Sequence, residues 1–427
     1  MRERIAIISG IRTPFCKAGG VFKDYRADDL GAFVVKELLS RSELSPDEID
    51  EVIFGNVLQP PHATNIARVL AVKAGLPNHV PAFTVNRNCA SGLEAIVAGA
   101  NRILLGDADI IIAGGTEVMS DFPVLFKKQM REFLMKFQKA KSWKQRMQIL
   151  STFRFGFLAP DIPGIADPLC GLTMGQTAEL LSRQFHITRE EQDAFALMSQ
   201  QRAVEATENG RFAEEILPIP VPPKMDKMQM NDVGPRKGQT MEILAKLKPH
   251  FERLTGTVTA ANSSQVTDGA ACVLLMSEAK AKKMGLNPLG YLRAHAVVGL
   301  DPRRMGLGPA FAIPKVLDKV PMSLKDIDLI EINEAFAAQV IAVEKALASD
   351  EFAKNELGRD RAVGEIDPDR LNVNGGAIAL GHPVGVSGTR LVLTLLLEMR
   401  HRNMHTGIAT MCVGGGQGEA AILEVES

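Results

Sequence analysis

The sequence is poor in cysteine, and its few cysteines are not arranged in pairs. Five are present, at positions 16, 89, 170, 272 and 412, and none belongs to a Cys-X-X-Cys motif. An odd number without such pairs argues against a disulfide framework and against a zinc site. We therefore expect a reducing compartment and no bound metal.

Long apolar runs and a signal-type N-terminus are also lacking. No stretch approaches the roughly 18 apolar residues of a membrane-spanning helix. The chain starts with the charged segment RERIAIISG rather than with the apolar core of a signal peptide. We therefore predict a cytoplasmic protein, or a mitochondrial matrix protein if a transit peptide has been removed.

An excess of charge of one sign is absent as well. The 49 Lys and Arg residues nearly balance the 50 Asp and Glu residues, which leaves a formal net charge of −1. This balance argues against nucleic acid or an anionic membrane as the main partner of the whole chain, so any basic surface must be local. The length of 427 residues exceeds the roughly 250–300 residues that one hydrophobic core serves, so two or three packed units are expected.

Short β-branched runs alternate with amphipathic helical stretches, which predicts an α/β fold with helix-covered sheets. The chain also contains an internal repeat. Three segments of the first half recur in the same order in the second half: 45–56 at 323–334, 83–92 at 371–388, and 108–117 at 406–418. We interpret this as a duplicated α/β half whose two copies pack together with equivalent strand ends close to each other.

The repeat is interrupted by residues 121–252, which are rich in Met, Lys and Phe and include the Pro-rich LPIPVPPK. We interpret this stretch as an inserted loop domain. Residues 1–120 together with 253–280 then form the first half, and residues 281–427 form the second half.

Cys89 and His382 are the candidate nucleophile and base. Cys89 lies where the strand PAFTVN meets the helix ASGLEAIVAGANRILLG. The free amides and dipole of a helix N-terminus favour a thiolate there. His382 lies in Gly-His-Pro, in the second half's counterpart of the Cys89 turn. A buried packing cysteine and a structural histidine are the alternative interpretations, but facing copies of the repeat would pair a nucleophile with its activator.

Two further strand ends carry polar or glycine-rich turns. Cys412 precedes three glycines, whose unshielded amides can approach a ligand and form an oxyanion hole. Asn333 follows the strand Leu329–Ile332, at the end where α/β proteins bind ligands. Each signal alone is also compatible with a strand terminator or a cap.

Taken together, these motifs resemble one family. Cys89 in NRNCASG, Asn333 in NEAF, His382 in GHPVGVSG and Cys412 in CVGGG occur in the order and approximate spacing of the four catalytic loops of the thiolases. The likeness covers nearly the whole chain. It implies a five-layer α-β-α-β-α core of two five-stranded halves, an inserted loop domain, homodimers or tetramers, and acyl transfer between acyl-CoA and CoA in fatty acid β-oxidation or related lipid metabolism.

The resemblance also implies a role for each matching residue. Cys89 would carry the acyl group, His382 would activate Cys89, and Cys412 would act as acid and base. Asn333 would hold a water molecule in one oxyanion hole, and the amides of Cys89 and Gly414 would form a second.

Two more positions match contacts to the substrate. Ser264 in TAANSSQVTDGA and Met174 in TMGQTAE, the latter in a loop, fall where thiolases contact the pantetheine arm of CoA. CoA is a substrate in this reaction, and no bound cofactor is expected.

Several functional alternatives remain open on the sequence alone. A β-ketoacyl-carrier-protein synthase shares the duplicated core but lacks a second catalytic thiol, which argues against it because Cys412 is present. A non-catalytic lipid-binding protein could also use this fold. Within the thiolases, the insert is similar to that of the β subunits of trifunctional fatty-acid oxidation complexes, yet those usually carry His-Glu-Ala-Phe where this chain has Asn333. An acetoacetyl-CoA-specific biosynthetic thiolase is therefore the main alternative.

Residues 126–147 of the insert are strongly basic, with Glu132 as the only acid. Apolar residues recur at helical spacing, so we predict one basic amphipathic helix. It would either pack on the core or dock to a partner subunit or an anionic membrane surface. The basic residues are Lys127, Lys128, Arg131, Lys136, Lys139, Lys141, Lys144 and Arg146.

Overall fold

The strands form one large mixed sheet in the computed structural model, which describes residues 4–161 and 166–426. The strand order is β12-β13-β14-β11-β1-β10-β5-β3-β4. The strands are β1 (Ile5–Arg12), β3 (Glu51–Gly55), β4 (Ala82–Val85), β5 (Ile110–Val118), β10 (Thr267–Ser277), β11 (Gly290–Gly299), β12 (Leu329–Ile332), β13 (Thr406–Val413) and β14 (Gln417–Glu424), with β2 (Cys16–Lys17) pairing with β10.

Alternation along the strands explains how helices cover both faces. In β5, Ile110 and Ile112 pack in one apolar cluster, whereas Ile111 and Ala113 pack in another. A strand with apolar residues on both faces must be covered on both faces. The main helices are α1 (Ala27–Ser42), α2 (Ile66–Lys73), α3 (Ser91–Leu104), α10 (Gly308–Leu317), α11 (Ala337–Leu347) and α14 (Ser387–Arg402).

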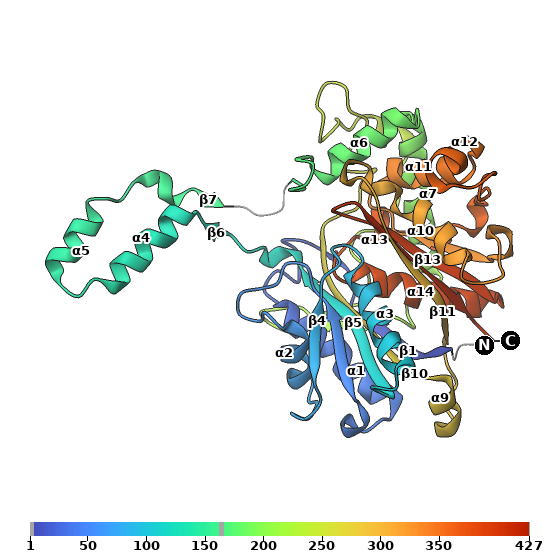
Figure 1. Cartoon of the computed structure of the whole chain (residues 1–427), viewed down its shortest axis with the longest axis horizontal. Helices are drawn as coiled ribbons and strands as arrows, with labels where there is room; N and C mark the ends of the chain where they lie inside the picture. The colour runs from blue at the N-terminus through green and yellow to red at the C-terminus, as the bar shows by residue number, and fades with distance from the viewer. Residues whose placement is uncertain (1–3, 162–165, 427) are drawn as a thin grey trace.

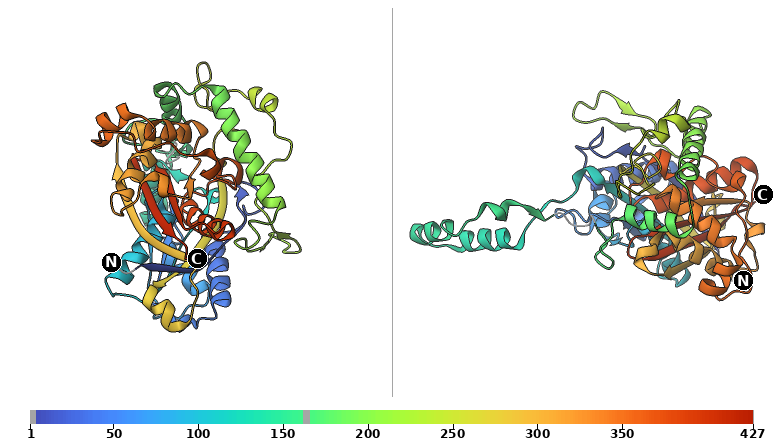
Figure 2. Two further views of the ribbon diagram at one scale, coloured as in Figure 1. Left: turned by 90° about the vertical axis from the view of Figure 1, so that its right-hand side faces the viewer. Right: turned by 90° about the horizontal axis from the view of Figure 1, so that it is seen from above.

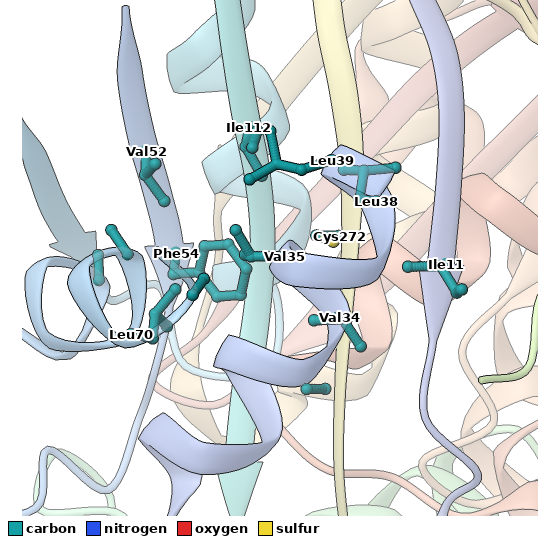
Figure 3. Packing of buried hydrophobic residues seen from close by; sticks show 14 of the residues in the cluster. Ile11, Val34, Val35, Leu38, Leu39, Val52, Phe54, Leu70, Ile112 and Cys272 are labelled. Carbon is teal, nitrogen blue, oxygen red and sulfur yellow. The ribbon is translucent and has the colours of Figure 1, made fainter. Parts of the chain in front are cut away.

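Three apolar clusters lie between the layers of helices and sheet, and the layers themselves can be followed in Figures 1 and 2. Helices α1 and α2 cover the outer face of the first half, where Val35 and Leu70 meet Phe54 (Figure 3). Helices α10 and α11 cover the outer face of the second half. Helices α3 and α14 pack between the two halves. The predicted α-β-α-β-α layering is therefore confirmed.

The repeat is visible in local structure. Ser45 and Ser323 each cap a short 3-10 turn ahead of β3 and β12, which pair in parallel with β5 and β13 respectively. Asp50 accepts hydrogen bonds from the first amides of β5, and Asp328 does the same at the start of β13. The two halves thus share the same helix cap and the same aspartate contact at equivalent positions.

One detail of the predicted halves differs. The ladder does not stop between them, because Ile5–Ile7 of β1 pair with Gly290–Leu292 of β11. The described part of the second half, residues 281–426, has no counterpart of β4. Leu371 forms only an isolated bridge to Ile330, and the chain then turns at Asn372, which has φ of 44°. The prediction of two five-stranded halves is therefore wrong for the second half, whose described residues form four strands, β11 to β14.

The inserted segment contains α6 (Met174–Gln184), α7 (Arg189–Glu208) and a hairpin of α4 (Lys128–Lys139) and α5 (Trp143–Leu150). The hairpin extends away from the rest of the molecule (Figures 1 and 2). The prediction of one helix over 126–147 is wrong, because Ala140 leaves the helical conformation and Ser142 caps a second helix by accepting from the Gln145 amide. The alternative that it packs on the core is also wrong.

Residues 253–280 include β10, which pairs with β1 and β5. None of the described helices is long and apolar enough to cross a membrane.

Candidate active site

Cys89 lies between strand β4 and helix α3, two residues before the first residue of α3. The preceding Asn88 has φ of 43°, and its carbonyl accepts hydrogen bonds from the amide and hydroxyl of Ser91. The turn therefore holds the half-buried thiol at the helix N-terminus, as expected. The predicted stabilisation of the thiolate is incomplete, because burial raises the pKa of Cys89 more than amide hydrogen bonds from Gly414 and Cys89 itself lower it.

His382 lies in a buried turn between α13 (Ala377–Leu380) and α14, outside either helix as predicted. Its amide donates to the carbonyl of Gln265, and its Nδ1 atom is 2.6 Å from the Oγ atom of Ser387. Because the Ser387 hydroxyl donates to the Pro383 carbonyl, its lone pair accepts from Nδ1–H. The proton is thereby assigned to Nδ1, and Nε2 is left with a free lone pair.

The imidazole of His382 is neutral near pH 7. Burial, together with the positive charge of Arg390, lowers the pKa of His382 to about 4. Its Nε2 atom is buried and has no hydrogen-bond partner within residues 4–161 and 166–426. Since buried polar atoms are normally paired, such an atom is suited to accept a proton from a reacting group.

Two neighbouring helices bring the turns of Cys89 and His382 together. The first turns of α3 and α14 contact each other, and the Thr389 hydroxyl donates to the Gly92 carbonyl. A Cβ atom on Gly388 would lie 2.4 Å from the Leu93 nitrogen, so only glycine permits this approach. The equivalent turns of the two repeats therefore meet at the centre of the molecule.

Cys412 is buried near the end of β13, where the chain turns through three glycines into β14. Burial raises its pKa, and the nearby Cys89 raises it further, so Cys412 remains a thiol. The Gly414 amide lies near the sulfur of Cys89 and lowers the pKa of that thiol. The Gly414 carbonyl accepts from the Nδ2 atom of Asn88 at 2.8 Å. The structure thus joins the Cys89 turn to the Cys412 turn.

Asn333 follows β12, and its amide donates to the Thr410 carbonyl of β13. Its side chain is completely buried, yet neither its Oδ1 nor its Nδ2 atom has a hydrogen-bond partner among the described residues. A buried amide of this kind is suited to bind a water molecule or a substrate oxygen.

The two predicted substrate contacts border the same region. The Ser264 amide donates to the Ala335 carbonyl, two residues after Asn333. Met174 packs with Cys412 in one apolar cluster, and its sulfur lies beside Gly414. It is the first residue of helix α6, so its prediction as a loop residue is wrong.

The sequence interpretation missed three residues that hold these turns. Ser387 orients His382, Asn88 joins two loops, and Asp167 accepts from the Gly415 amide at 2.8 Å. Asn88 and Ser387 lie inside the motifs NRNCASG and GHPVGVSG, so their polar side chains could have been predicted to hold the two turns. Asp167 lies in the insert, far from Gly415 in sequence, and only tertiary structure reveals its contact.

Family models match nearly the whole chain. Residues 5–279 match the thiolase N-terminal domain, and residues 286–425 match the thiolase C-terminal domain. The chain belongs to the thiolase family. It is therefore an acyltransferase enzyme.

Individual thiolases are similar over their full lengths. A 3-ketoacyl-CoA thiolase of Photorhabdus laumondii is 45% identical over 99% of this chain and 97% of its own length, and one of Yersinia enterocolitica is 44% identical over the same shares. These likenesses favour a thiolase over a β-ketoacyl-carrier-protein synthase or a non-catalytic protein.

Solved structures show the same fold. Bacillus anthracis acetyl-CoA acetyltransferase has a TM-score of 0.87 and 38% identity, with 99% of each chain covered. Human mitochondrial 3-ketoacyl-CoA thiolase has a TM-score of 0.85 and 38% identity, with 100% of this chain and 99% of that chain covered. The human enzyme has also been solved in complex with CoA.

Proposed function

We propose that this thiolase uses CoA to cleave 3-ketoacyl-CoA into acetyl-CoA and a shortened acyl-CoA, as in fatty acid β-oxidation. It uses CoA as a substrate and needs no bound cofactor. The observation that carries the proposal is that the Cys89 and Cys412 turns lie together, since Asn88 donates to the Gly414 carbonyl at 2.8 Å. Cys89 is close enough to Cys412 to raise the pKa of its thiol. The named relatives support the substrate class.

In the first step, Cys89 transfers its proton to the Nε2 atom of His382 and attacks the 3-keto carbon. The carbonyl oxygen becomes an oxyanion, which the amides of Cys89 and Gly414 stabilise. The bond between carbons 2 and 3 then breaks. The acyl group stays on Cys89, and the enolate of acetyl-CoA leaves.

In the second step, the Cys412 thiol protonates the enolate to give acetyl-CoA, while Asn333 and its water stabilise the enolate oxygen. Because burial raises the pKa of Cys412, its thiol is the stable form and returns after each turnover. Incoming CoA gives its proton to the Cys412 thiolate and attacks the acyl group on Cys89. Cys89 leaves as a thiolate and recovers its proton from His382, so all protons balance.

The test is a thiolysis assay with 3-ketoacyl-CoA and free CoA, followed by loss of the enolate absorbance. Mass spectrometry of the quenched enzyme then locates the acyl adduct. We expect turnover and an adduct on Cys89. Cys16→Ser serves as the control, because Cys16 is a buried cysteine of the apolar cluster under α1. An adduct on any residue other than Cys89 would contradict the proposal.

An acetoacetyl-CoA-specific biosynthetic thiolase is the second candidate, and the likeness to an acetyl-CoA acetyltransferase supports it. The two candidates share every catalytic residue and differ in the length of acyl chain that they accept. Measurement of kcat/KM for 3-ketoacyl-CoA substrates from four to sixteen carbons separates them. A value that falls steeply beyond four carbons favours the biosynthetic enzyme.

We further propose that two copies of the chain associate through strand β4. This strand is the last in the sheet, pairs with β3 alone among the residues that the structure describes, and leaves its four residues only partly buried. An edge of this kind is a template for pairing with a second chain. Sedimentation velocity at micromolar concentration is expected to give a dimer or a tetramer, and a monomer at that concentration would contradict the proposal.

We also propose that the α4–α5 hairpin binds an anionic membrane surface. Met130 and Phe133 are buried within the hairpin, but other apolar side chains are exposed: Trp143 at the start of α5 is 74% exposed, and Met135 is 55% exposed. Lysines surround them, and each Lys or Arg near an anionic bilayer contributes about 1 kcal/mol. A basic segment with exposed apolar residues is suited to the membrane interface.

Liposome co-sedimentation tests this surface. Binding to vesicles with anionic lipid is expected at low salt, and it should weaken at high salt and in a variant with Lys136, Lys139, Lys141 and Lys144 changed to Gln. A matched control changes Lys282, Lys283, Lys325 and Lys354, which lie outside the hairpin. Absence of binding at low salt would contradict the proposal of membrane binding. A partner subunit would then remain as the candidate that binds the hairpin. We also propose that the enzyme is cytoplasmic. Reversible attachment to a membrane or to a partner subunit is compatible with that location.

A further inference from the structure

Glu117 is a completely buried carboxylate that lies on neither catalytic turn. It occupies the end of β5, in the first half of the molecule. Among the described residues it makes no ion pair, and burial raises its pKa to about 7 even though three backbone amides lower it. A buried carboxylate without a cation is costly, so its hydrogen bonds must offset that cost.

The partners of Glu117 come from both halves of the thiolase. Its Oε1 atom accepts from the Nδ2 atom of Asn56 at 2.9 Å and from the Leu58 amide at 3.2 Å. Its Oε2 atom accepts from the Val57 amide at 2.9 Å and from the Gly385 amide at 3.0 Å. Gly385 lies three residues after His382, so one carboxylate ties the loop after β3 to the His382 turn.

A second contact shows how closely the two halves approach here. A Cβ atom on Gly115 would lie 2.0 Å from the Gly385 carbonyl oxygen. The His382 turn therefore rests directly on the backbone of β5. At its other end, the His382 amide donates to Gln265. The turn is thus anchored at both ends by residues of the first half, to which Cys89 also belongs.

We propose that Glu117 is a positioning residue for His382, and that its carboxylate sets the place of the imidazole relative to Cys89 by binding the Gly385 amide. Positioning matters because a displacement of about 1 Å at a reacting group can cost about 100-fold in rate. Only a carboxylate offers two acceptor oxygens to donors on both sides. The amide of Gln would turn its NH2 group toward two of the four N–H donors.

The inference rests on the proposed function, and the experiment separates the two. The assay is run at about pH 8.5, where the Glu117 side chain is ionised because its pKa is about 7. In Glu117→Gln, kcat for thiolysis is then expected to fall about 10- to 100-fold while KM for CoA changes less than about twofold. The control is Glu344→Gln, because Glu344 is another largely buried acid, on α11, whose pKa burial raises to about 7. This control should keep the wild-type kcat.

A readout without turnover is the 15N NMR spectrum of histidine-labelled enzyme. The Nδ1–H signal of His382, assigned with His382→Gln, should shift in Glu117→Gln and stay in place in Glu344→Gln. If wild type shows no thiolysis, the proposed function fails and the NMR comparison alone decides the positioning role.

A folded Glu117→Gln enzyme with wild-type kcat, or an unmoved His382 signal, would overturn the inference. If Glu117→Gln does not fold, Asn56→Ala removes one donor on the first-half side. It should lower kcat about threefold at constant KM, and an unchanged kcat would overturn the proposal equally.

Discussion

Acidification provides a direct test of the neutral His382. The pKa of His382 is lowered to about 4 by burial and by Arg390, against about 6.5 in an unfolded chain. The imidazole therefore keeps its free Nε2 lone pair until the pH approaches 4. We expect the acid limb that arises from His382 itself near pH 4 to 5, well below the ordinary histidine range. Protonation of Glu117, whose pKa burial raises to about 7, would give a separate limb that is absent in Glu117→Gln.

The same shift makes folding stability depend on pH. Between the two pKa values the unfolded chain binds a proton that the folded enzyme does not, so stability rises with pH. The contribution is complete above pH 6.5 and is lost as the pH falls toward 4. A shift from 6.5 to about 4 corresponds to roughly 3 kcal/mol at 1.36 kcal/mol for each pKa unit.

Two measurements check this prediction. Rapid-quench mass spectrometry gives the rate of acyl-enzyme formation between pH 4 and pH 8. Urea unfolding at pH 4.5 and pH 7 compares wild type with His382→Gln, and wild type should lose roughly 2 kcal/mol more on acidification. The rates are also measured in Glu117→Gln, which removes the titration of Glu117. An acid limb near pH 6.5 in Glu117→Gln, or the same loss of stability in wild type and His382→Gln, would refute the reasoning.

Further predictions concern the other residues of the site. Cys89→Ser should abolish acyl-enzyme formation while the circular dichroism spectrum stays native, because an alkoxide is far less accessible than a thiolate. Cys412→Ala should still form the acyl-enzyme but exchange the α-protons of acetyl-CoA with deuterated solvent much more slowly, and exchange at the wild-type rate would mean that Cys412 is not the base. Ser387→Ala removes a hydrogen bond worth about 0.5–1.5 kcal/mol, so acylation should slow about two- to tenfold. Gly388→Ala should lower the melting temperature by several degrees, because its Cβ atom would meet the Leu93 backbone nitrogen at 2.4 Å.

Local sequence determined the repeated elements and the chemistry at their ends. The serine caps and the aspartates ahead of β3 and β12 are short-range features, so the repeat could be recognised from residues alone. Asn333 follows a buried strand, and Cys412 lies near the end of another. Cys89 follows the partly buried strand β4, and His382 lies in the turn before α14. Their motifs are local, and this is why sequence sufficed to select them.

Local sequence was less informative about where strands and helices end. The segment 371–374 resembles β4, but it turns away after one bridge to β12 because Asn372 bonds to the strand's backbone with its side chain. In the basic segment, the helical spacing of apolar residues did not predict that the first helix ends before Ala140 and that Ser142 caps a second helix. Periodicity indicates that a helix forms but not where it stops.

Tertiary structure alone decided the electrostatics of the site. A helix N-terminus predicts a lowered pKa for Cys89, yet burial between the two halves raises it, because desolvation outweighs two amide hydrogen bonds. Likewise, the sequence around Glu117 does not predict its hydrogen bond to Gly385, which lies 268 residues away. Residue types and their order determined which groups react, and the packing of one repeat against the other determined their charge states and positions.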